Sequence, residues 1–386
     1  MRVLEATEII YGELINSPAI GSFDSFTTKV ADVKRGTLFF ASDIDDVNIA
    51  LQNGAFGVVF DTPMQISNAE VAWIKVDNIQ NSIVRLVRYL LVSKKIEIIL
   101  LDEIQYAIAK EIIRTNEVLF FEESTKNSNI SWGASVVCVG DLLNDITKHN
   151  PTKIITSLKG IAELSIEEYT ICVNKQDLVL DIITPHQIFE SKFYHKISAY
   201  QIPLPAVFMP ELNAVIELCL REEIAFELRD FAPIEKLLPI ALSPEAEILP
   251  LGKSSKVVIP THSIDIFLRY TKYLRENAKF GELMFFVPRI LDDKSKEIFT
   301  PIQEAQNSTI NTHSAPAMVE FCIQANNTDE ETAQEALQAI CYDTSNELPK
   351  MLKLKRFNFA LVLGIGTEGL IFLLNEASKD TSPMLF

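Results

Sequence analysis

The sequence predicts an α/β protein with more than one domain, and three observations support this prediction. Its 386 residues are more than one ordinary hydrophobic core accommodates. Apolar residues make up 48% of the chain and charged residues 23%, which indicates packed globular domains rather than disorder. Strand-like and helix-like segments alternate along the chain, which favours mainly parallel sheets covered by helices on both faces.

The first predicted domain covers residues 1–94. Strand patterns lie at 37–41, 56–61 and 72–77, and helix patterns lie at 48–55 and 79–95. The first helix is closed by Gly54, and the second is amphipathic and ends in lysines, as helix C-termini prefer. This order predicts a small βαβα unit.

The second predicted domain covers residues 95–244. It restarts the alternation with strand patterns at 96–101, 135–140 (SVVCVG) and 153–158 and a helix at 107–114. Such alternation again predicts a mainly parallel sheet.

The third predicted domain covers residues 245–386. EAEIL (245–249) and KVVIP (256–260) flank a turn-like GKSS, which predicts a hairpin at the domain boundary. A helix (265–277), a strand (283–288) and a closing strand–turn–helix (357–377) follow, and the polar segment 303–317 is expected to be an exposed loop.

Charge and cysteine content restrict the partners and the compartment. A formal charge of −17 repels polyanions, so neither nucleic acid nor an anionic membrane surface is an expected partner. The N-terminus has glutamates where a signal peptide needs an apolar run, and no apolar run reaches the length of a membrane span. The five widely spaced cysteines are expected to be reduced, mostly core thiols of a cytoplasmic protein: Cys138, Cys172, Cys219, Cys322 and Cys341.

Three segments, in order along the chain, resemble the Mur ligase family. The N-terminal pattern of VKRGTLFFA, NGAFGVVFD and IKVDNIQNSIVRLVRYL is similar to the first domain of the MurF-like branch, which adds D-alanyl-D-alanine to UDP-N-acetylmuramoyl-tripeptide. Met209–Ile224 resembles the helix that carries the family's His-Asn-x-x-Asn-Ala, and ALVLGIGTEGLIFLLNE resembles its closing strand, glycine turn and helix. The resemblance implies a bacterial, cytoplasmic protein linked to peptidoglycan, with a small N-terminal α/β domain, a central parallel-sheet domain and a Rossmann-like C-terminal domain.

The phosphate-binding loop of that family is missing. The family's Gly-x-x-Gly-Lys-Thr-Thr loop holds ATP phosphates on backbone N–H groups and a lysine. Here the flanking strand and helix remain (Ile96–Ile113), but the loop positions Asp102–Ile108 contain no glycine and no lysine. Two carboxylates, Asp102 and Glu103, stand there instead, so we expect no ATP binding in the family's manner.

The family's substrate residues are also replaced. Its Asp-Ser-Arg falls on Lys29, Val30 and Ala31, with a displaced Asp24-Ser25 pair upstream, and the loop after Phe-Phe-Ala is shortened to 42–47. Its His-Asn becomes Met209-Pro210, although Asn213 and Ala214 remain, and its Val-Lys-Gly-Ser becomes Val362–Ile365. The apolar framework persists around eroded functional positions, which is typical of a fold retained for a different purpose.

Other motifs have structural interpretations. Gly252-Lys253-Ser254 resembles the end of a phosphate loop, but Glu247 stands where the first glycine is required, so we interpret it as a turn. Gly364, Gly366 and Gly369 form G-x-G-x-x-G, but too few residues follow for the second strand of a dinucleotide-binding unit, and a structural turn is expected.

The polar residue clusters predict no metal site. Surface or capping roles are expected for the histidines, solvated loops for the acidic pairs and core positions for the strand aromatics. These residues are His149, His186, His195, His262 and His313; Asp45-Asp46, Glu122-Glu123 and Asp292-Asp293; Phe39, Phe40, Phe285 and Phe286. Ser263 is expected to be an N-cap, and His262 is the one histidine near the family's cleft.

The sequence thus predicts no catalytic, cofactor-binding or metal-binding residue and no cofactor. The leading hypothesis is a non-catalytic Mur-ligase-like protein, a pseudoenzyme that binds another protein in peptidoglycan or cell-envelope assembly. One alternative is a binding module for a UDP-sugar or peptidoglycan precursor (a muropeptide). The other is a divergent ligase or an enzyme with a re-invented site, for which His262 is the first candidate.

Overall fold

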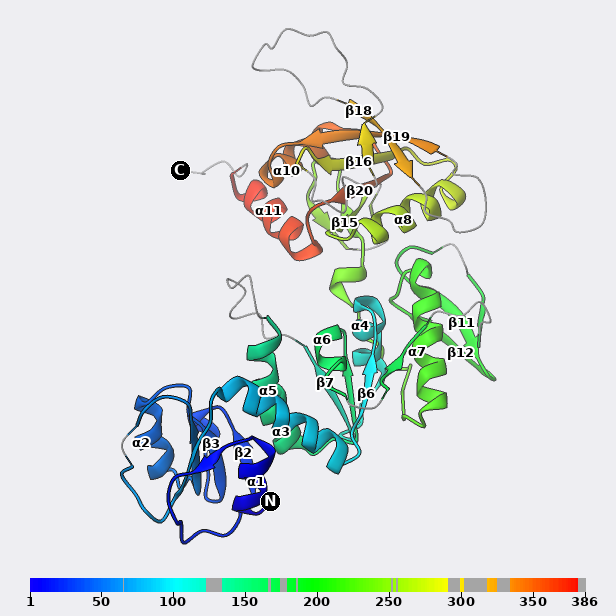
Figure 1. The fold of residues 1–386 in the computed structure, drawn as a ribbon. Helices are drawn as coiled ribbons and strands as arrows, with labels where there is room; N and C mark the ends of the chain where they lie inside the picture. Colours follow the sequence, from blue (N-terminus) through cyan, green and yellow to red (C-terminus); the bar gives the residue numbers. More distant parts are fainter. Residues whose placement is uncertain are drawn as a thin grey trace, which may run out of the picture. The chain divides into compact units, whose positions relative to one another are not determined.

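The computed structural model describes residues 1–64, 66–122, 134–165, 168–173, 179–184, 187–250, 253–254, 256–290, 299–301, 318–324 and 334–380. They form two compact units, Met1–Asp177 with Glu211–Glu227 and Leu178–Pro210 with Leu228–Phe386. Strands alternate with helices in both units (Figure 1), which confirms the α/β class. The three domains divided at 94/95 and 244/245 stay a prediction.

The first sheet of the first unit has the strand order β1-β5-β4-β3-β2. Its strands are β1 (Glu13–Leu14), β2 (Ser25–Thr27), β3 (Thr37–Phe40), β4 (Gly57–Phe60) and β5 (Ala72–Lys75). β2 to β5 run parallel, and β1 runs antiparallel to β5. Helix α2 (Asp45–Gln52) packs on one face with Phe39, and helices α1 (Val3–Ile9) and α3 (Ile79–Ser93) pack on the other face with Phe40. Burial of both faces explains the continuous apolar strands.

A second sheet in this unit is entirely parallel, in the order β7-β8-β6-β9. Its elements are β6 (Glu97–Leu100), α4 (Glu103–Ile112), β7 (Val118–Phe121), α5 (Ala134–His149), β8 (Lys153–Thr156), α6 (Lys159–Ala162) and β9 (Thr170–Ile171), and α7 (Met209–Arg221) follows later in the chain. Helices α3 and α5 pack against each other. One buried apolar cluster, containing Ile83, Leu142 and Ile154, therefore joins the two sheets.

The strand predicted at 135–140 is wrong, because this segment lies in helix α5. A short apolar run does not distinguish a strand from a buried helix. The deciding pattern continues beyond the run: Val139, Leu142, Leu143 and Ile146 are all buried at the i, i+3, i+4, i+7 spacing of one helix face.

The second unit contains an antiparallel sheet and a larger mixed sheet. The small sheet consists of β10 (Leu180–Ile182), β11 (Ser191–His195) and β12 (Ser198–Ile202). The large sheet has the order β14-β13-β15-β20-β16-β19-β18-β17. Its strands are β13 (Ile240–Leu242), β14 (Ile248–Leu249), β15 (Lys256–Thr261), β16 (Leu283–Pro288), β17 (Phe299–Pro301), β18 (Met318–Gln324), β19 (Gln334–Tyr342) and β20 (Phe359–Leu363). The four middle strands are parallel.

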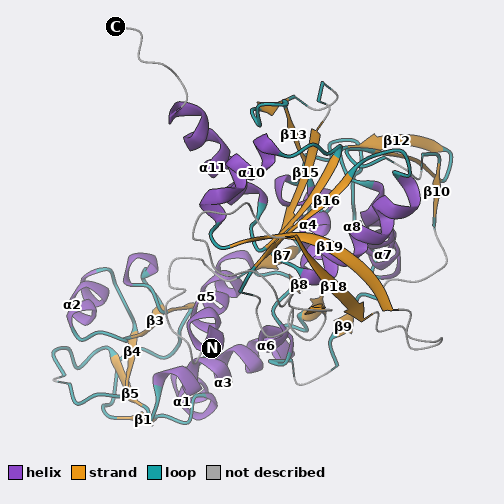
Figure 2. Cartoon of the chain, turned by 90° about the horizontal axis from the view of Figure 1, so that it is seen from above, coloured by secondary structure: helices purple, strands orange, loops and turns teal. Residues whose placement is uncertain are grey.

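Helices cover opposite faces of these parallel strands. Helix α8 (Ile264–Asn277) lies on one side, and α10 (Leu348–Leu354) and α11 (Thr367–Asp380) lie on the other (Figures 1 and 2). The ring of Phe267 in α8 packs 6.0 Å from that of Phe285, centroid to centroid. The neighbouring Phe286 belongs to the cluster that contains Leu370 and Leu374 of α11.

The predicted hairpin between 245–249 and 256–260 is wrong in its pairing. β14 and β15 do not pair with each other; β13 lies between them and pairs antiparallel with both. The tight turn precedes β14, where Ala246 takes φ 67° and Ser243 N–H donates to Glu247 O at 2.8 Å. A sequence pattern identifies strands but not which neighbour each strand pairs with.

Short 3₁₀ turns complete the described structure: η1 (Val30–Asp32), η3 (Ala206–Phe208), η4 (Glu235–Leu237) and η5 (Ser345–Glu347). Among the described residues, no helix has both the length and the apolar character needed to span a bilayer. The four strand phenylalanines, Phe39, Phe40, Phe285 and Phe286, are buried as predicted. Cys219 and Cys341 are buried free thiols, and Cys172 is half-buried.

Candidate functional sites

The β6–α4 connection is where the sequence resemblance predicts the phosphate loop, and a side-chain cap closes it. Asp102 is the N-cap of α4, and its Oδ1 accepts the N–H groups of Ile104 at 2.8 Å and Gln105 at 2.7 Å. In return, Gln105 Oε1 accepts the N–H of Asp102 at 3.1 Å. This capping box occupies N–H groups that an anion would otherwise bind.

Apolar side chains pack beneath this cap. Leu101, Ile104 and Tyr106 are 3%, 8% and 4% exposed, so the connection has a filled interior rather than an open loop. The Tyr106 ring meets Phe120 edge to face, with centroids 5.7 Å apart. The Tyr106 hydroxyl is buried and has no hydrogen-bond partner among the described residues, and burial, with Glu122 nearby, raises its pKa far above the ordinary value.

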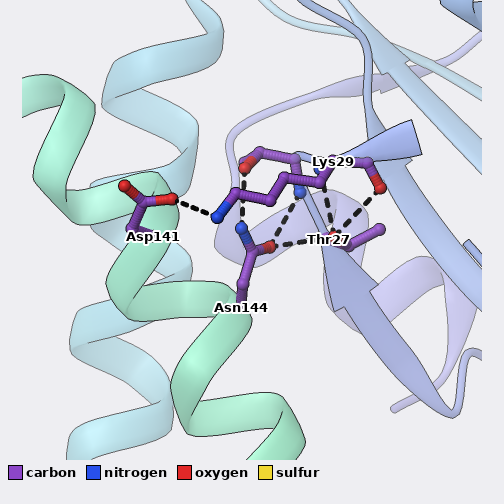
Figure 3. A network of polar contacts seen from close by, with 5 residues as sticks. Thr27, Lys29, Asp141 and Asn144 are labelled. Carbon is purple, nitrogen blue, oxygen red and sulfur yellow. Dashed lines mark hydrogen bonds and ion pairs between the residues drawn. The ribbon is translucent and has the colours of Figure 1, made fainter. Parts of the chain in front are cut away.

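A polar network joins the end of β2 to helix α5 (Figure 3). The Asn144 side-chain oxygen accepts the Thr27 hydroxyl at 2.9 Å and the Thr28 N–H at 3.0 Å. The Asn144 amide nitrogen donates to the Thr28 hydroxyl at 3.0 Å. Because Asn144 is only 8% exposed, these bonds also satisfy a buried amide.

Lys29 forms the exposed margin of this network. Its ammonium lies 2.7 Å from the Asp141 carboxylate, and this hydrogen bond raises the Lys29 pKa. The pair is largely solvated and contributes little stability. The aligned positions that hold Asp-Ser-Arg in the family therefore hold a lysine bound to this chain's own helix α5.

A cavity of about 250 Å³ lies beside the network within the first unit. It is lined by Ser25, Phe26, Thr27, Asp32, Lys34, Asn144, Thr147 and Lys148. Two ammonium groups, hydroxyls and one aromatic ring give it the donors and stacking surface that a small polar ligand needs, and its size is below the usual range for drug-sized ligands.

A second candidate site lies at the carboxyl edge of the large sheet. The neighbouring parallel strands β15 and β20 end together, with Thr261 paired to Leu363. β15 continues into α8 on one face of the sheet, and β20 continues into α11 on the other (Figure 1). Adjacent connections that leave toward opposite faces form a topological switch point, which is where open α/β sheets bind ligands.

The turn after β20, Gly364–Gly366, is called the glycine turn below. Gly364 has φ +94°, and its N–H donates to Thr261 O at 2.8 Å. The Tyr342 hydroxyl donates to Leu363 O, and burial raises the Tyr342 pKa to about 12. An added Cβ at Gly366 would lie 3.1 Å from His262 Nε2, so the imidazole lies over this glycine.

Helix α11 starts from the glycine turn without a side-chain cap among the described hydrogen bonds. Gly366 O accepts the first helical bond from Leu370 N–H at 3.0 Å. The N–H groups of Thr367, Glu368 and Gly369 have no acceptor in the described part of the chain. The Thr367 hydroxyl is also buried without a partner there, a state that costs roughly 1–3 kcal/mol.

The structure tests the other polar residues singled out in the sequence. His149 and His262 are exposed, as predicted, but His195 is 7% exposed in β11, so a surface role for it is wrong. The alternation of β11 points His195 to the buried face, and burial lowers its pKa. His186, His313, Glu123, Asp292-Asp293, Gly252 and segment 303–317 lie outside the described residues.

Several further predictions have outcomes. Ser263 caps α8 by accepting the N–H of Ile266 at 3.4 Å, as predicted. The Ser254 hydroxyl accepts the N–H of Leu242 at 3.1 Å and donates to Leu242 O at 2.6 Å, and the turn at Gly252-Lys253-Ser254 stays a prediction. Met209 and Asn213 are buried at 1% and 0% exposure. Within the described ranges, no three His, Cys, Asp or Glu residues form a potential metal site.

Solved structures are similar to this chain in fold. The MurF ligase from Thermotoga maritima in complex with ADP matches over 93% of this chain and 98% of its own, at 11% identity and a TM-score of 0.50. The chain has the Mur-ligase fold. Matches to MurF from Acinetobacter baumannii (11% identity, 76% and 79% of the two chains, TM-score 0.40) and to a UDP-N-acetylmuramoyl-L-alanyl-D-glutamate–2,6-diaminopimelate ligase (10%, 98% and 100%, TM-score 0.37) also occur.

Sequence comparisons find no match to this chain. No protein-family model matches the chain, and no curated protein matches it. The Mur-ligase fold is therefore established by the arrangement of strands and helices, which the apolar framework predicted.

The sequence did not reveal two features of this Mur-ligase-fold chain. The Thr27–Asn144 bond joins residues 117 positions apart, and no local pattern encodes such a pairing. The unpartnered Thr367 hydroxyl lies inside G-x-G-x-x-G, so that motif was the signal that could have pointed to it.

Proposed function

We propose that this chain is a Mur-ligase-fold pseudoenzyme of the cytoplasm, without ATP-dependent ligase chemistry, that acts by binding another protein in peptidoglycan or cell-envelope assembly. The capping box of Asp102 carries this proposal. Its carboxylate accepts the N–H groups of Ile104 and Gln105, so the start of α4 already holds an anion that belongs to the chain.

Electrostatics support the same proposal. The MurF structure from Thermotoga maritima contains ADP, and the family's loop supplies glycines and a lysine for phosphate. Here Asp102 and the exposed Glu103 would face the phosphate, and each unit charge pair at about 4 Å repels by roughly 1–4 kcal/mol. Buried Leu101, Ile104 and Tyr106 leave the backbone no room to re-form the loop.

Isothermal titration of the full chain with ATP and Mg²⁺ tests the loss of ligase chemistry. We expect no micromolar binding, with the Thermotoga maritima ligase as the positive control. Micromolar ATP binding by the parent chain would overturn the proposal, and a changed ATP affinity in Asp102→Lys or Glu103→Lys would locate that binding at this connection.

Genetic complementation tests the non-catalytic role in the source organism. A deletion strain should be rescued by the chain and equally by His262→Ala, the first candidate for a re-invented catalytic site. Failure of a well-expressed His262→Ala protein to rescue would favour an enzyme over a binding protein.

A binding module for a UDP-sugar or peptidoglycan precursor is the second candidate, favoured by the cavity beside β2 and α5. Lys34 and Lys148 line it with the hydroxyls of Ser25, Thr27 and Thr147, which suits a small anionic or hydroxylated ligand. UDP-sugars and muropeptides should raise the melting temperature of the parent and less so that of Lys34→Ala, with Lys95→Ala as the surface control. Absence of any shift across the panel would remove this candidate.

A further inference from the structure

We propose that the glycine turn and the first turn of α11 bind the phosphate group of a small ligand. This site lies in the second unit and is separate from the β6–α4 connection. The inference goes beyond the proposed function, and either of the two can be wrong without the other.

Four hydrogen-bond donors at one helix start carry the inference. The N–H groups of Thr367, Glu368 and Gly369 have no acceptor among the described residues, and they belong to the first turn of a 14-residue helix. Free N–H groups at a helix start attract anions through their donors and through the helix dipole. The fourth donor is the Thr367 hydroxyl in the same turn.

The Thr367 hydroxyl is an observation independent of the helix start. Thr367 is only 7% exposed, and its Oγ1 is a buried oxygen that lacks a partner in the described chain. Buried hydroxyls in proteins are nearly always hydrogen-bonded, and this unpartnered one, unlike that of Tyr106, lies in the same helix turn as three N–H groups without an acceptor among the described residues. Valine has the same shape as threonine without the hydroxyl, so packing alone does not require a threonine at this position.

The backbone around these donors lies at the surface of the second unit. Gly364, Glu368 and Gly369 are exposed and Gly366 is half-buried, whereas the Thr367 hydroxyl is buried. The His262 imidazole packs against Gly366. The turn also occupies the switch point between β15 and β20, where ligands bind in this sheet type.

Phosphate fits this donor set better than carboxylate. A phosphate group has three terminal oxygens for three N–H groups and a hydroxyl, whereas a carboxylate has two oxygens. The one opposing charge on the turn is Glu368, whose side chain is exposed in the first turn of α11. It should weaken the site without blocking it, because exposed charges are screened.

Calorimetry of the full chain with inorganic phosphate and pyrophosphate tests the site, with acetate as the carboxylate probe. We expect both phosphates to bind and acetate to bind much more weakly. Thr367→Val should weaken phosphate binding roughly tenfold, since it deletes one hydrogen bond to a charged group. Thr367→Ser, which keeps the hydroxyl, should bind like the parent.

Two further variants separate binding from folding. Glu368→Gln is a surface change that should tighten phosphate binding by roughly two- to fivefold through loss of repulsion. Thr271→Val, in α8, removes a buried hydroxyl that already donates to Phe267 O at 2.8 Å, so it should leave phosphate affinity unchanged. Without phosphate, Thr367→Val should melt no lower than the parent, which a merely structural hydroxyl would not allow.

Three results would overturn the inference: no phosphate binding at millimolar concentration, acetate binding as tightly as phosphate, or phosphate affinity unchanged in both Thr367→Val and Glu368→Gln. ATP titrations distinguish this inference from the proposed function. Binding lost in Thr367→Val but kept in Asp102→Lys supports the α11 site, and the reverse pattern locates ATP at the β6–α4 connection.

Discussion

Two strand-to-helix connections of this chain differ in the hydrogen-bond acceptors of the first N–H groups of the helix. At β6–α4, Asp102 caps the helix with its own carboxylate, and buried side chains fill the connection. At β20–α11, glycines form the turn, and the first N–H groups and the Thr367 hydroxyl have no acceptor among the described residues. The difference teaches that one chain can satisfy the first N–H groups of one helix with a side chain and leave those of another without an acceptor among the described residues.

The largest predicted effect is at the glycine turn. Gly364→Ala should lower the free energy of unfolding of the second unit by about 2–3 kcal/mol, because Gly364 has φ +94° and an added Cβ would lie 2.8 Å from the Tyr342 hydroxyl. Urea unfolding measures this loss. Gly21→Ala, where an added Cβ meets nothing within 4 Å, is the control and should change little. Equal effects of the two substitutions would show that the turn is not constrained.

Removing the cap should have the next largest effect. Asp102→Ala should destabilise α4 by about 1–2 kcal/mol, since the N–H groups of Ile104 and Gln105 lose their acceptor. Hydrogen exchange at α4 and urea unfolding report the change. Asp102→Asn keeps a side-chain oxygen and should recover most of the loss; if it is as unstable as Asp102→Ala, the cap is not what stabilises this connection.

Tyr342→Phe should cost about 1 kcal/mol at neutral pH, because the hydroxyl donates to Leu363 O at the end of β20. Burial raises the Tyr342 pKa to about 12, so its contribution is present below the unfolded value of about 10 and is lost as pH rises from there through the folded value. The stability difference between parent and variant should therefore shrink above about pH 10. A difference that grows with pH would contradict this sign.

The smallest effect is expected at Tyr106 in the filled connection. Tyr106→Phe should change the unfolding free energy by less than about 0.5 kcal/mol or increase it, since the hydroxyl is buried without a partner among the described residues. The midpoints of urea unfolding of the parent and the variant measure this change in unfolding free energy. A loss above about 1 kcal/mol would mean that this hydroxyl has a hydrogen-bond partner in the folded chain.

Local patterns predicted part of the fold correctly. Strands β3, β4 and β5 of the N-terminal sheet, helix α8 and the capping role of Ser263 follow from periodicity and cap chemistry. The strand predicted at residues 135–140 was wrong because a short apolar run has no periodicity that distinguishes a strand from a helix. The β14–β15 pairing was wrong because β13, which precedes both, inserts between them.

The absence of glycine and lysine at Asp102–Ile108, from which we predict that the phosphate loop is replaced, was determined by the sequence itself, and no packing can supply these residues. The alternation of strands and helices was likewise local information. Only the tertiary structure decided that Asn144 reaches Thr27 across 117 positions, and that β15 and β20 end side by side with their helices on opposite faces. Hydrogen bonds and sheet neighbours depend on three-dimensional distance, which periodicity and composition do not encode.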